Sequence, residues 1–432
     1  MKLLNDLRPP TLPRRPDLGR LQRSLRALRR VDFRRPQVIG VALVAALALG
    51  ITAALVGSSG GSGGASSVLG HGRKGGAAKK VSQVLLATKP ADKTGAVPLD
   101  AHVRVDATNG HLTSVQVTPA SGKALAGSLT SDGGTWRSAG PLAPGTRYRV
   151  TVVAADQAGV TTRQVSSFTT LTPSRVLNTS IMPLEGQTVG VGMPIAVWFN
   201  QPVADRAAVE RHLKVETSSD VEGAWRWFND REVHFRPKKF WPSGERVTVN
   251  LGLAGVKAAP GTWGVASRTV HFRIGDSRIS TVSASSHTMK VTVNDRVVKT
   301  IPVSTGRDKY PTTNGVHFVI SKEQDKLMDS ATVGIPRDSP DGYYEHVYWS
   351  VRISNSGEFV HAAPWSVGSQ GRANVSHGCV NMSTENAQWF FKLAQPGDVV
   401  TVVGSPKKPN NWTLGVADWN ISWSRWLAGS AL

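Results

Sequence analysis

The sequence predicts a mainly β protein that carries one N-terminal transmembrane helix. Three observations lead to this fold class: residues 38–56 contain no charge, short β-type runs separated by Gly- and Pro-containing turns begin at residue 81, and one clear helical pattern falls at 384–393. At typical domain sizes the 432 residues allow about three folded domains. We therefore expect two immunoglobulin-like β-sandwich modules, followed by a β-rich C-terminal domain with one short helix.

The apolar stretch 38–56 is long enough to cross a bilayer as a helix, which takes about 20 residues. The arginine-rich segment 1–37 directly precedes it, and the positive-inside rule keeps such a segment in the cytoplasm. A cleaved secretory signal is the alternative, with small residues at 64–66 for a peptidase, although a 37-residue leader is long for one. Both cases export the rest of the chain. With the anchor retained, we expect a single-pass protein of the cell membrane with its C-terminal ectodomain in the periplasm or cell-wall space.

The formal net charge of +21 is concentrated near the N-terminus. Residues 1–37 carry +8 and residues 57–80 carry +4, which leaves +9 over residues 81–432. The basic residues follow no nucleic-acid recognition motif. Nucleic acid is therefore not an expected partner.

The part of the chain expected to be exported begins with three segments that differ in composition. Residues 57–80 form a Gly/Ser/Lys-rich linker, and two sets of β-type runs follow, at 81–172 (module A) and 173–275 (module B). Neither set shows a cluster of acids or histidines with metal-ligand spacing, so spacing and contact are their expected roles. The runs lie at 101–105, 112–117, 147–154 and 165–169 in module A, and at 195–199, 221–227, 233–236, 247–253 and 269–274 in module B.

The third segment, 276–404, opens with β-branched runs at 290–293 and 297–303 around an Asn294-Asp295 turn, which predicts a hairpin. Residues 321–345 contain several Pro and Gly residues and are expected to form a long connection that acts as a flap over a site. Ser383 is the expected N-cap of the helix at 384–393. Residues 405–432 form a Trp-rich extension, whose Trp419, Trp423 and Trp426 have the spacing of one helical face. We expect this strip to pack on the third segment rather than to bind a sugar.

Cys379 is the only cysteine, so it cannot form an internal disulfide, and a lone thiol in an exported protein draws attention as a nucleophile. A plain buried cysteine is the alternative. Two histidines, His361 and His377, compete for the role of base. The backbone amides of Gly378 and Cys379 are natural donors to an oxyanion. A zinc site built from the two histidines and the cysteine lacks the paired ligand spacing of such sites, so neither a metal nor any other cofactor is expected.

These residues carry a resemblance to a known family. The runs His361-Ala362-Ala363-Pro364-Trp365-Ser366 and Ser376-His377-Gly378-Cys379-Val380-Asn381 resemble the active-site signature of the L,D-transpeptidases, bacterial enzymes that cross-link peptidoglycan. The runs at 302–306, 313–315, 328–330 and 415–426 also resemble the actinobacterial, mycobacterial-type members, as does the order of anchor, two immunoglobulin-like modules and catalytic domain.

The resemblance implies the chemistry. Cys379 attacks the meso-diaminopimelate carbonyl of a tetrapeptide donor stem and releases D-alanine, while His361 pairs with the thiolate and relays protons, oriented by the backbone carbonyl of Ala362. The diaminopimelate side-chain amine of an acceptor stem then resolves the thioester into a 3-3 cross-link, an acyl transfer that serves cell-wall biogenesis and cell shape. Carbapenem-type β-lactams are implied as covalent inhibitors. His377 has a supporting role, and the implied substrate-binding residues are Tyr343, Ser356, Gly357, Asn381, Trp365 and Ser376.

Val333 departs from the family pattern, because mycobacterial members often place a second flap tyrosine there. Hydrolysis of the thioester, which would make the enzyme an L,D-carboxypeptidase, is the alternative activity. The non-enzymatic alternative is a wall-binding scaffold whose thiol is idle.

Overall fold

The computed structural model describes residues 80–409 and 417–432. The predicted cytoplasmic tail (1–37), the transmembrane helix (38–56) and nearly all of the linker (57–80) lie outside these residues, as do residues 410–416. Within the described ranges no helix is both long enough and apolar enough to span a bilayer. The span at 38–56 therefore stays a prediction.

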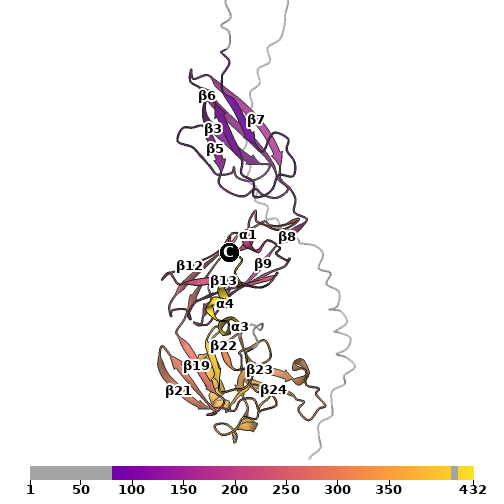
Figure 1. Cartoon of the computed structure of the whole chain (residues 1–432), viewed down its shortest axis with the longest axis vertical. Helices are drawn as coiled ribbons and strands as arrows, with labels where there is room; N and C mark the ends of the chain where they lie inside the picture. The colour runs from indigo at the N-terminus through magenta and orange to yellow at the C-terminus, as the bar shows by residue number, and fades with distance from the viewer. Residues whose placement is uncertain (1–79, 410–416) are drawn as a thin grey trace, which may run out of the picture. The chain divides into compact units, whose positions relative to one another are not determined.

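The described chain is mainly β, as predicted. Module A is built from two antiparallel sheets (Figure 1). Buried and exposed residues alternate along β6, so one face of the strand contributes Val150 and Val152 to a core shared with Phe168. One sheet has the order β1-β2-β5-β4, and the other β3-β6-β7. The strands are β1 (Leu85–Lys89), β2 (Arg104–Thr108), β3 (Gly110–Pro119), β4 (Gly127–Leu129), β5 (Thr135–Ser138), β6 (Arg147–Asp156) and β7 (Thr161–Thr169).

Module B contains three sheets and one short helix, α1 (Arg206–Glu210). Its strand β11 is apolar throughout and almost fully buried, as expected for a strand covered on both faces. The sheet orders are β10-β18-β15-β12, β13-β14-β11-β9 and β16-β17-β8. The strands are β8 (Arg175–Leu177), β9 (Thr179–Met182), β10 (Thr188–Val189), β11 (Ile195–Phe199), β12 (Leu213–Thr217), β13 (Gly223–Asn229), β14 (Glu232–Pro237), β15 (Arg246–Leu251), β16 (Lys257–Ala259), β17 (Thr262–Gly264) and β18 (Arg268–Ile274).

The C-terminal domain packs a five-stranded sheet, order β21-β20-β19-β27-β22, and a four-stranded sheet, order β23-β24-β25-β26, around one apolar core. Asn294 and Asp295 have φ of 47° and 65°, the left-handed values that a two-residue hairpin turn requires, so the predicted hairpin is confirmed. The strands are β19 (Arg278–Ser283), β20 (Thr288–Val293), β21 (Arg296–Pro302), β22 (Gly315–Phe318), β23 (Ser321–Asp329), β24 (Tyr344–Arg352), β25 (Phe359–Ala362), β26 (Val380–Met382) and β27 (Val399–Val403).

The helix predicted at 384–393 is confirmed as α2 (Thr384–Leu393). The Ser383 hydroxyl accepts a hydrogen bond from the backbone N–H of Asn386 at 3.3 Å, which satisfies one of the unpaired donors of the first turn. Phe390 and Ala387 are buried, and the helix packs against β24 and β25. It thereby supports the strand that ends in the histidine signature.

The prediction of a long connection at 321–345 is wrong for residues 321–329. Residues 321–329 form β23, which pairs antiparallel with β24, and the loop proper is 330–343, entered through the short 3₁₀ helix η1 (Ser330–Val333). The segment is Ser-Lys-Glu-Gln-Asp-Lys-Leu-Met-Asp, whose polar residues have low β-propensity. Pairing with β24, rather than local preference, makes it a strand. We call residues 330–343 the flap.

The C-terminal extension contacts module B as well as the C-terminal domain, which differs from the expected packing on the catalytic domain alone. It forms two short helices, α3 (Ala417–Asn420) and α4 (Trp423–Leu427). The Arg236 guanidinium of module B lies 4.9, 5.2 and 4.6 Å from the rings of Trp419, Trp423 and Trp426. Asn420 bonds both backbone groups of Val316 in β22, at 2.7 and 2.9 Å. The tryptophans therefore gather around a buried cation, which attracts their π faces.

Candidate active site

Two parallel strands bring the two signature runs together. β25 pairs with β26 so that His361 lies opposite Asn381, and Cys379 directly precedes β26. Gly378 has φ of +121°, a conformation that a side-chain-bearing residue rarely adopts. This bend places Cys379 at the wall of a recess instead of continuing the strand backwards.

His361 is buried, and its Nδ1 lies 2.8 Å from the carbonyl oxygen of Ala362. The carbonyl can only accept, so Nδ1 carries the proton and Nε2 is left with a lone pair. Burial lowers the pKa of His361 to about 4. The Trp365 ring lies 6.2 Å from the imidazole, and 57% of Trp365 is exposed. The imidazole expected to act as the base thus lies against the expected carbonyl, beside an exposed aromatic ring.

The thiol of Cys379 lies 3.9 Å from the carbonyl oxygen of Gly357, a weak S–H hydrogen bond. Burial raises its pKa to about 12, and the nearby Glu358 carboxylate acts in the same direction. A neutral thiol beside a neutral imidazole is therefore favoured at rest. Burial penalises both charges, and the thiolate–imidazolium pair that the family resemblance implies stays a prediction.

The loop before Cys379 is braced by Ser376. Its hydroxyl donates to the carbonyl oxygen of Cys379 at 2.6 Å and accepts from the N–H of Gly378 at 3.1 Å. Of the two amides expected as oxyanion donors, Gly378 is thus already engaged. Among the described residues no group accepts a hydrogen bond from the N–H of Cys379. The Ser376 hydroxyl donates its one proton within its own loop and keeps one lone pair, so the substrate contact expected of it stays a prediction.

Two recesses flank the cysteine, and Tyr343, His377 and Cys379 line both of them. The larger, of about 590 Å³, also contains Ser356 and Gly357, while the smaller, of about 400 Å³, contains His361, Trp365, Ser376 and Asn381. Burial and the neighbouring Cys379 raise the pKa of Tyr343 to about 12, which keeps its phenol protonated as a donor. The residues expected to bind substrate thus lie along one continuous wall around the thiol.

Asn381 is buried but only partly satisfied. Its Nδ2 donates to the Ser366 hydroxyl at 3.2 Å, whereas its Oδ1 accepts no hydrogen bond from any described residue. A buried carbonyl oxygen without a partner is costly. Asn381 lines the smaller recess, but its Oδ1 has almost no accessible surface, so it can accept from a bound peptide only if the side chain turns toward the recess.

Sequence reasoning missed a charged cluster beside His377. The Arg307 guanidinium donates from Nη2 to His377 Nε2 at 2.8 Å and also bonds Asp341 of the flap. His377 Nε2 therefore accepts, and the ring is neutral; burial and then Arg307 lower its pKa. Nε2 of His377 is thus occupied by Arg307, which agrees with a supporting role for His377, and His361 as the base stays a prediction. The run Arg307-Asp308-Lys309 was the available signal, but nothing local links it to residue 341.

Glu358 was also missed, although a carboxylate inside an apolar run is an anomaly that draws attention. It is 4% exposed, and it accepts hydrogen bonds from the N–H and hydroxyl of Thr313 (2.8 and 2.6 Å), the ammonium of Lys407 (3.1 Å) and the hydroxyl of Ser354 (3.1 Å). Burial alone would raise its pKa, but Lys407, His317 and Thr313 outweigh it and hold the pKa below its usual range. Glu358 ties three loops together behind Cys379.

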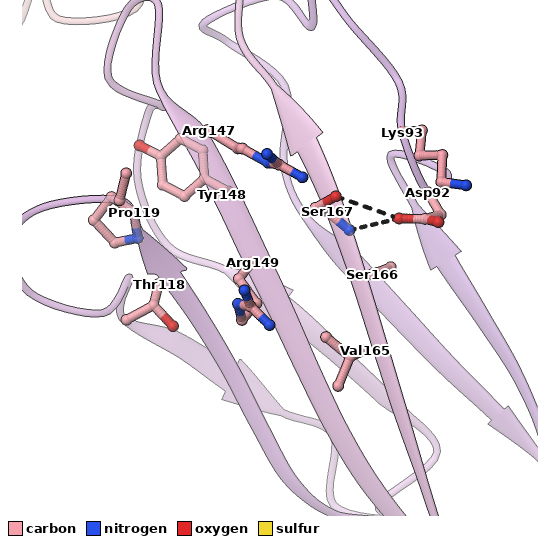
Figure 2. A pocket seen from close by; sticks show the side chains of 11 residues that line it. Asp92, Lys93, Thr118, Pro119, Arg147, Tyr148, Arg149, Val165, Ser166 and Ser167 are labelled. Atoms are coloured by element: carbon pink, nitrogen blue, oxygen red, sulfur yellow. Dashed lines mark hydrogen bonds between the residues drawn. The ribbon is translucent and has the colours of Figure 1, made fainter.

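A recess of similar size lies on module A, far in sequence from this chemistry. Figure 2 shows Arg147 and Arg149 of β6 beside Val165, Ser166 and Ser167 of β7, with Asp92 bonded to Ser167. Its volume is about 630 Å³, and its lining contains neither histidine nor cysteine. It therefore holds neither group of the Cys379–His361 pair.

Comparison with known proteins identifies the family. Residues 277–402 match the L,D-transpeptidase catalytic domain, and residues 94–257, across modules A and B, match the bacterial Ig domain.

L,D-transpeptidase 2 of Mycobacterium tuberculosis (strain CDC 1551 / Oshkosh) is 41% identical over 346 residues, which cover 80% of this chain and 85% of that protein. L,D-transpeptidase 5 of Mycobacterium tuberculosis (strain ATCC 25618 / H37Rv) is 35% identical over 356 residues, covering 80% of this chain and 77% of that protein. The solved structure of LD transpeptidase LdtMt1 in complex with imipenem is 41% identical, covers 54% of this chain and all of that one, and has a TM-score of 0.47. The cysteine site therefore lies in the catalytic domain of a chain that belongs to the L,D-transpeptidase family.

Proposed function

We propose that this chain is a cysteine L,D-transpeptidase that forms 3-3 cross-links in peptidoglycan. The observation that carries the proposal is that His361, with Nδ1 fixed by the Ala362 carbonyl, and Cys379 line one recess. A nucleophile, a base with its lone pair free and an orienting group are the parts that acyl transfer needs.

The first half-reaction forms a thioester. As the Cys379 sulfur attacks the diaminopimelate carbonyl of a donor tetrapeptide stem, the thiol proton passes to Nε2 of His361. Because both groups are neutral at rest, proton transfer accompanies attack rather than precedes it. The tetrahedral oxyanion takes the N–H of Cys379 as a donor. Collapse breaks the C–N bond to D-alanine, and the His361 imidazolium protonates the leaving amine.

The second half-reaction passes the acyl group to an acceptor. The side-chain amine of a diaminopimelate on a neighbouring stem attacks the thioester, His361 takes the proton of that amine, and the thiolate leaves. The same histidine then returns the proton to sulfur. The two recesses on either side of Cys379 have room for the two stems. Water in place of the amine would release a tripeptide, which is the carboxypeptidase outcome.

Mass spectrometry with a disaccharide tetrapeptide tests this proposal. The full-length chain is expected to give a dimer that has lost one D-alanine, and a carbapenem is expected to add covalently to Cys379. Cys379→Ala is expected to abolish both products. A tripeptide without dimer would reassign the activity to hydrolysis, and normal dimer formation by a folded Cys379→Ala variant would rule out the proposed nucleophile.

We also propose that the chain works outside the cytoplasmic membrane, held by the span at 38–56. The uncharged stretch itself and the arginine-rich segment before it support this placement. Membrane fractionation of cells that express the full chain, followed by protease treatment of spheroplasts, is expected to leave only an N-terminal fragment of about 6 kDa protected. Protection of the whole chain would contradict it.

A further inference from the structure

A carboxylate of the flap is held by three donors from one loop. Asp341 bonds the Arg307 guanidinium through Oδ1, while its Oδ2 accepts from the Lys309 ammonium at 2.5 Å and from the Tyr310 hydroxyl at 3.0 Å. Two cations and a hydroxyl converge on one carboxylate, which is the donor set of a carboxylate-binding site. These donors follow β21 and belong to the body of the domain, whereas Asp341 belongs to the flap.

The three donors, which we call the carboxylate cradle (Arg307, Lys309 and Tyr310), lie beside the nucleophile. Lys309 and Tyr310 line the larger recess together with Cys379. The Tyr310 ring lies 5.1 Å from the ring of His377, two residues before the cysteine. Arg307 reaches the same imidazole at 2.8 Å. A carboxylate held by this cradle is therefore close to the place where a bound peptide would be attacked.

Because Arg307 and Lys309 are both cations, only another anion can take the place of the Asp341 carboxylate between them. Asp341 is about one-fifth exposed as a side chain, and Lys309 about two-thirds exposed, so the pair is open to solvent and to competitors. Removing Asp341 without a substitute would leave Arg307 and Lys309 facing each other across the site. Lys407, the other cation of the recess, is already paired with Glu358. The cradle is thus the part of the recess with cationic donors to offer.

We propose that the carboxylate cradle is a substrate-carboxylate site, which Asp341 fills in the free chain and which the terminal D-alanine carboxylate of the donor stem takes over. This inference rests on the proposed function, because that carboxylate lies on the residue that the attack releases. Exchange of one carboxylate for another leaves no cation unpaired. Since Asp341 sits on the flap that also carries Tyr343, the exchange couples arrival of a donor to release of the flap.

Binding of N-acetyl-D-alanine, compared with its uncharged amide N-acetyl-D-alaninamide, tests the cradle without any turnover. Measured by calorimetry on the full chain, the acid is expected to bind more tightly than the amide. Asp341→Asn removes the internal competitor and is expected to raise the affinity for the acid roughly 5–10-fold without changing the affinity for the amide. Lys309→Met is expected to lower the affinity for the acid alone by a similar factor. Asp325→Asn is the matched control, because Asp325 lies on the stem of the same hairpin in an exposed pair with His346.

The outcomes separate this inference from the proposed function. If Asp341→Asn weakens both ligands or changes neither, Asp341 is only a structural contact and the inference is overturned. Should Asp341→Asn fail to fold, equal effects of Lys309→Met on acid and amide would overturn it instead. Absence of dimer and thioester from the tetrapeptide would sink the proposed function, whereas acid-selective binding would still establish the cradle.

Discussion

The imidazole of His361 donates from Nδ1 to the carbonyl oxygen of Ala362, the next residue in the chain, at 2.8 Å. A backbone carbonyl thus does the orienting that a carboxylate does in many other triads. Because a carbonyl cannot be removed by substitution of a side chain, the tautomer of His361 is set by the path of β25 and not by a second titratable group.

His361→Gln is expected to slow acylation of Cys379 by a carbapenem at least about 10³-fold, because the general base is lost. In the unsubstituted chain the rate is expected to fall as the pH drops through about 4, the pKa to which burial lowers His361. Time-resolved mass spectrometry measures both. His346→Gln, on the exposed face of β24, is the control. An inflection near pH 6.5 would show instead that the imidazole titrates as it does in water.

Gly357→Ala is expected to destabilise the domain and to slow acylation. Gly357 has φ of +94°, and a Cβ there would lie 2.9 Å from Cγ1 of Val333 in the flap. We expect a loss of about 1–3 kcal/mol in urea unfolding. Gly334→Ala is the matched control, since Gly334 has φ of +81° with nothing within 4 Å of the added Cβ and costs only the backbone conformation.

The double variant Val333→Ala/Gly357→Ala separates contact from backbone strain. If the close approach to Val333 contributes, the two changes together are expected to cost less than their sum, because shortening Val333 removes the crowding atom. Additive losses would show that the Val333 side chain moves aside without cost and that the backbone conformation of residue 357 alone explains the loss of stability.

Glu358→Gln is expected to lower stability by about 2 kcal/mol, because the change leaves Lys407 unpaired and disrupts hydrogen bonds around a buried group. Thermal unfolding measures the loss. Glu323→Gln, in a partly exposed pair with Lys326, is expected to change stability by less than about 0.5 kcal/mol. Equal effects of the two substitutions would mean that the Glu358 network contributes no more than a surface pair.

Much of this architecture follows from local sequence signals. The Asn294-Asp295 hairpin and the Ser383-capped helix α2 depend on neighbouring residues, and both were predictable from them. The signature runs also placed Cys379 and His361 correctly in one site, because their family pattern is specific. β23 was missed because its polar residues favour no strand until β24 pairs with them.

The charged contacts around the site could not be predicted from the sequence, for a different reason. Asp341 lies 34 residues from Arg307, and Glu358 lies 49 residues from Lys407, so loop paths and not periodicity bring them together. Trp419, Trp423 and Trp426 do not share one helical face as predicted, because Trp419 lies on α3 and the other two on α4, and their common partner, Arg236, lies in another module. Periodicity shows which residues share a face and does not identify what covers that face.

His234 is the buried group whose titration is expected to limit stability at alkaline pH. Its Nδ1 lies 2.7 Å from Asp418 Oδ1, and its Nε2 lies 3.0 Å from Glu232 Oε1, so both nitrogens face carboxylates and the ring is an imidazolium. Burial opposes the charge, but Asp418 and Glu232 outweigh it and raise the pKa to about 9. Because the folded state holds the proton more tightly than the unfolded chain, its contribution is complete below about pH 6.5 and is lost as the pH rises through about 9.

Asp398 acts in a lower pH window, which allows the two groups to be distinguished. Burial raises its pKa from 3.8 to about 7, so its contribution is lost as the pH rises from about 4 to 7. The melting temperature measured from pH 4 to 10 is expected to decline in two stages. Asp398→Asn is expected to flatten the acidic stage, and His234→Gln the alkaline one, at the cost of a lower melting temperature below pH 6.5. A melting temperature that rises between pH 6.5 and 9 would show that His234 is neutral in the folded chain and that Asp418, in helix α3, is held by something other than charge.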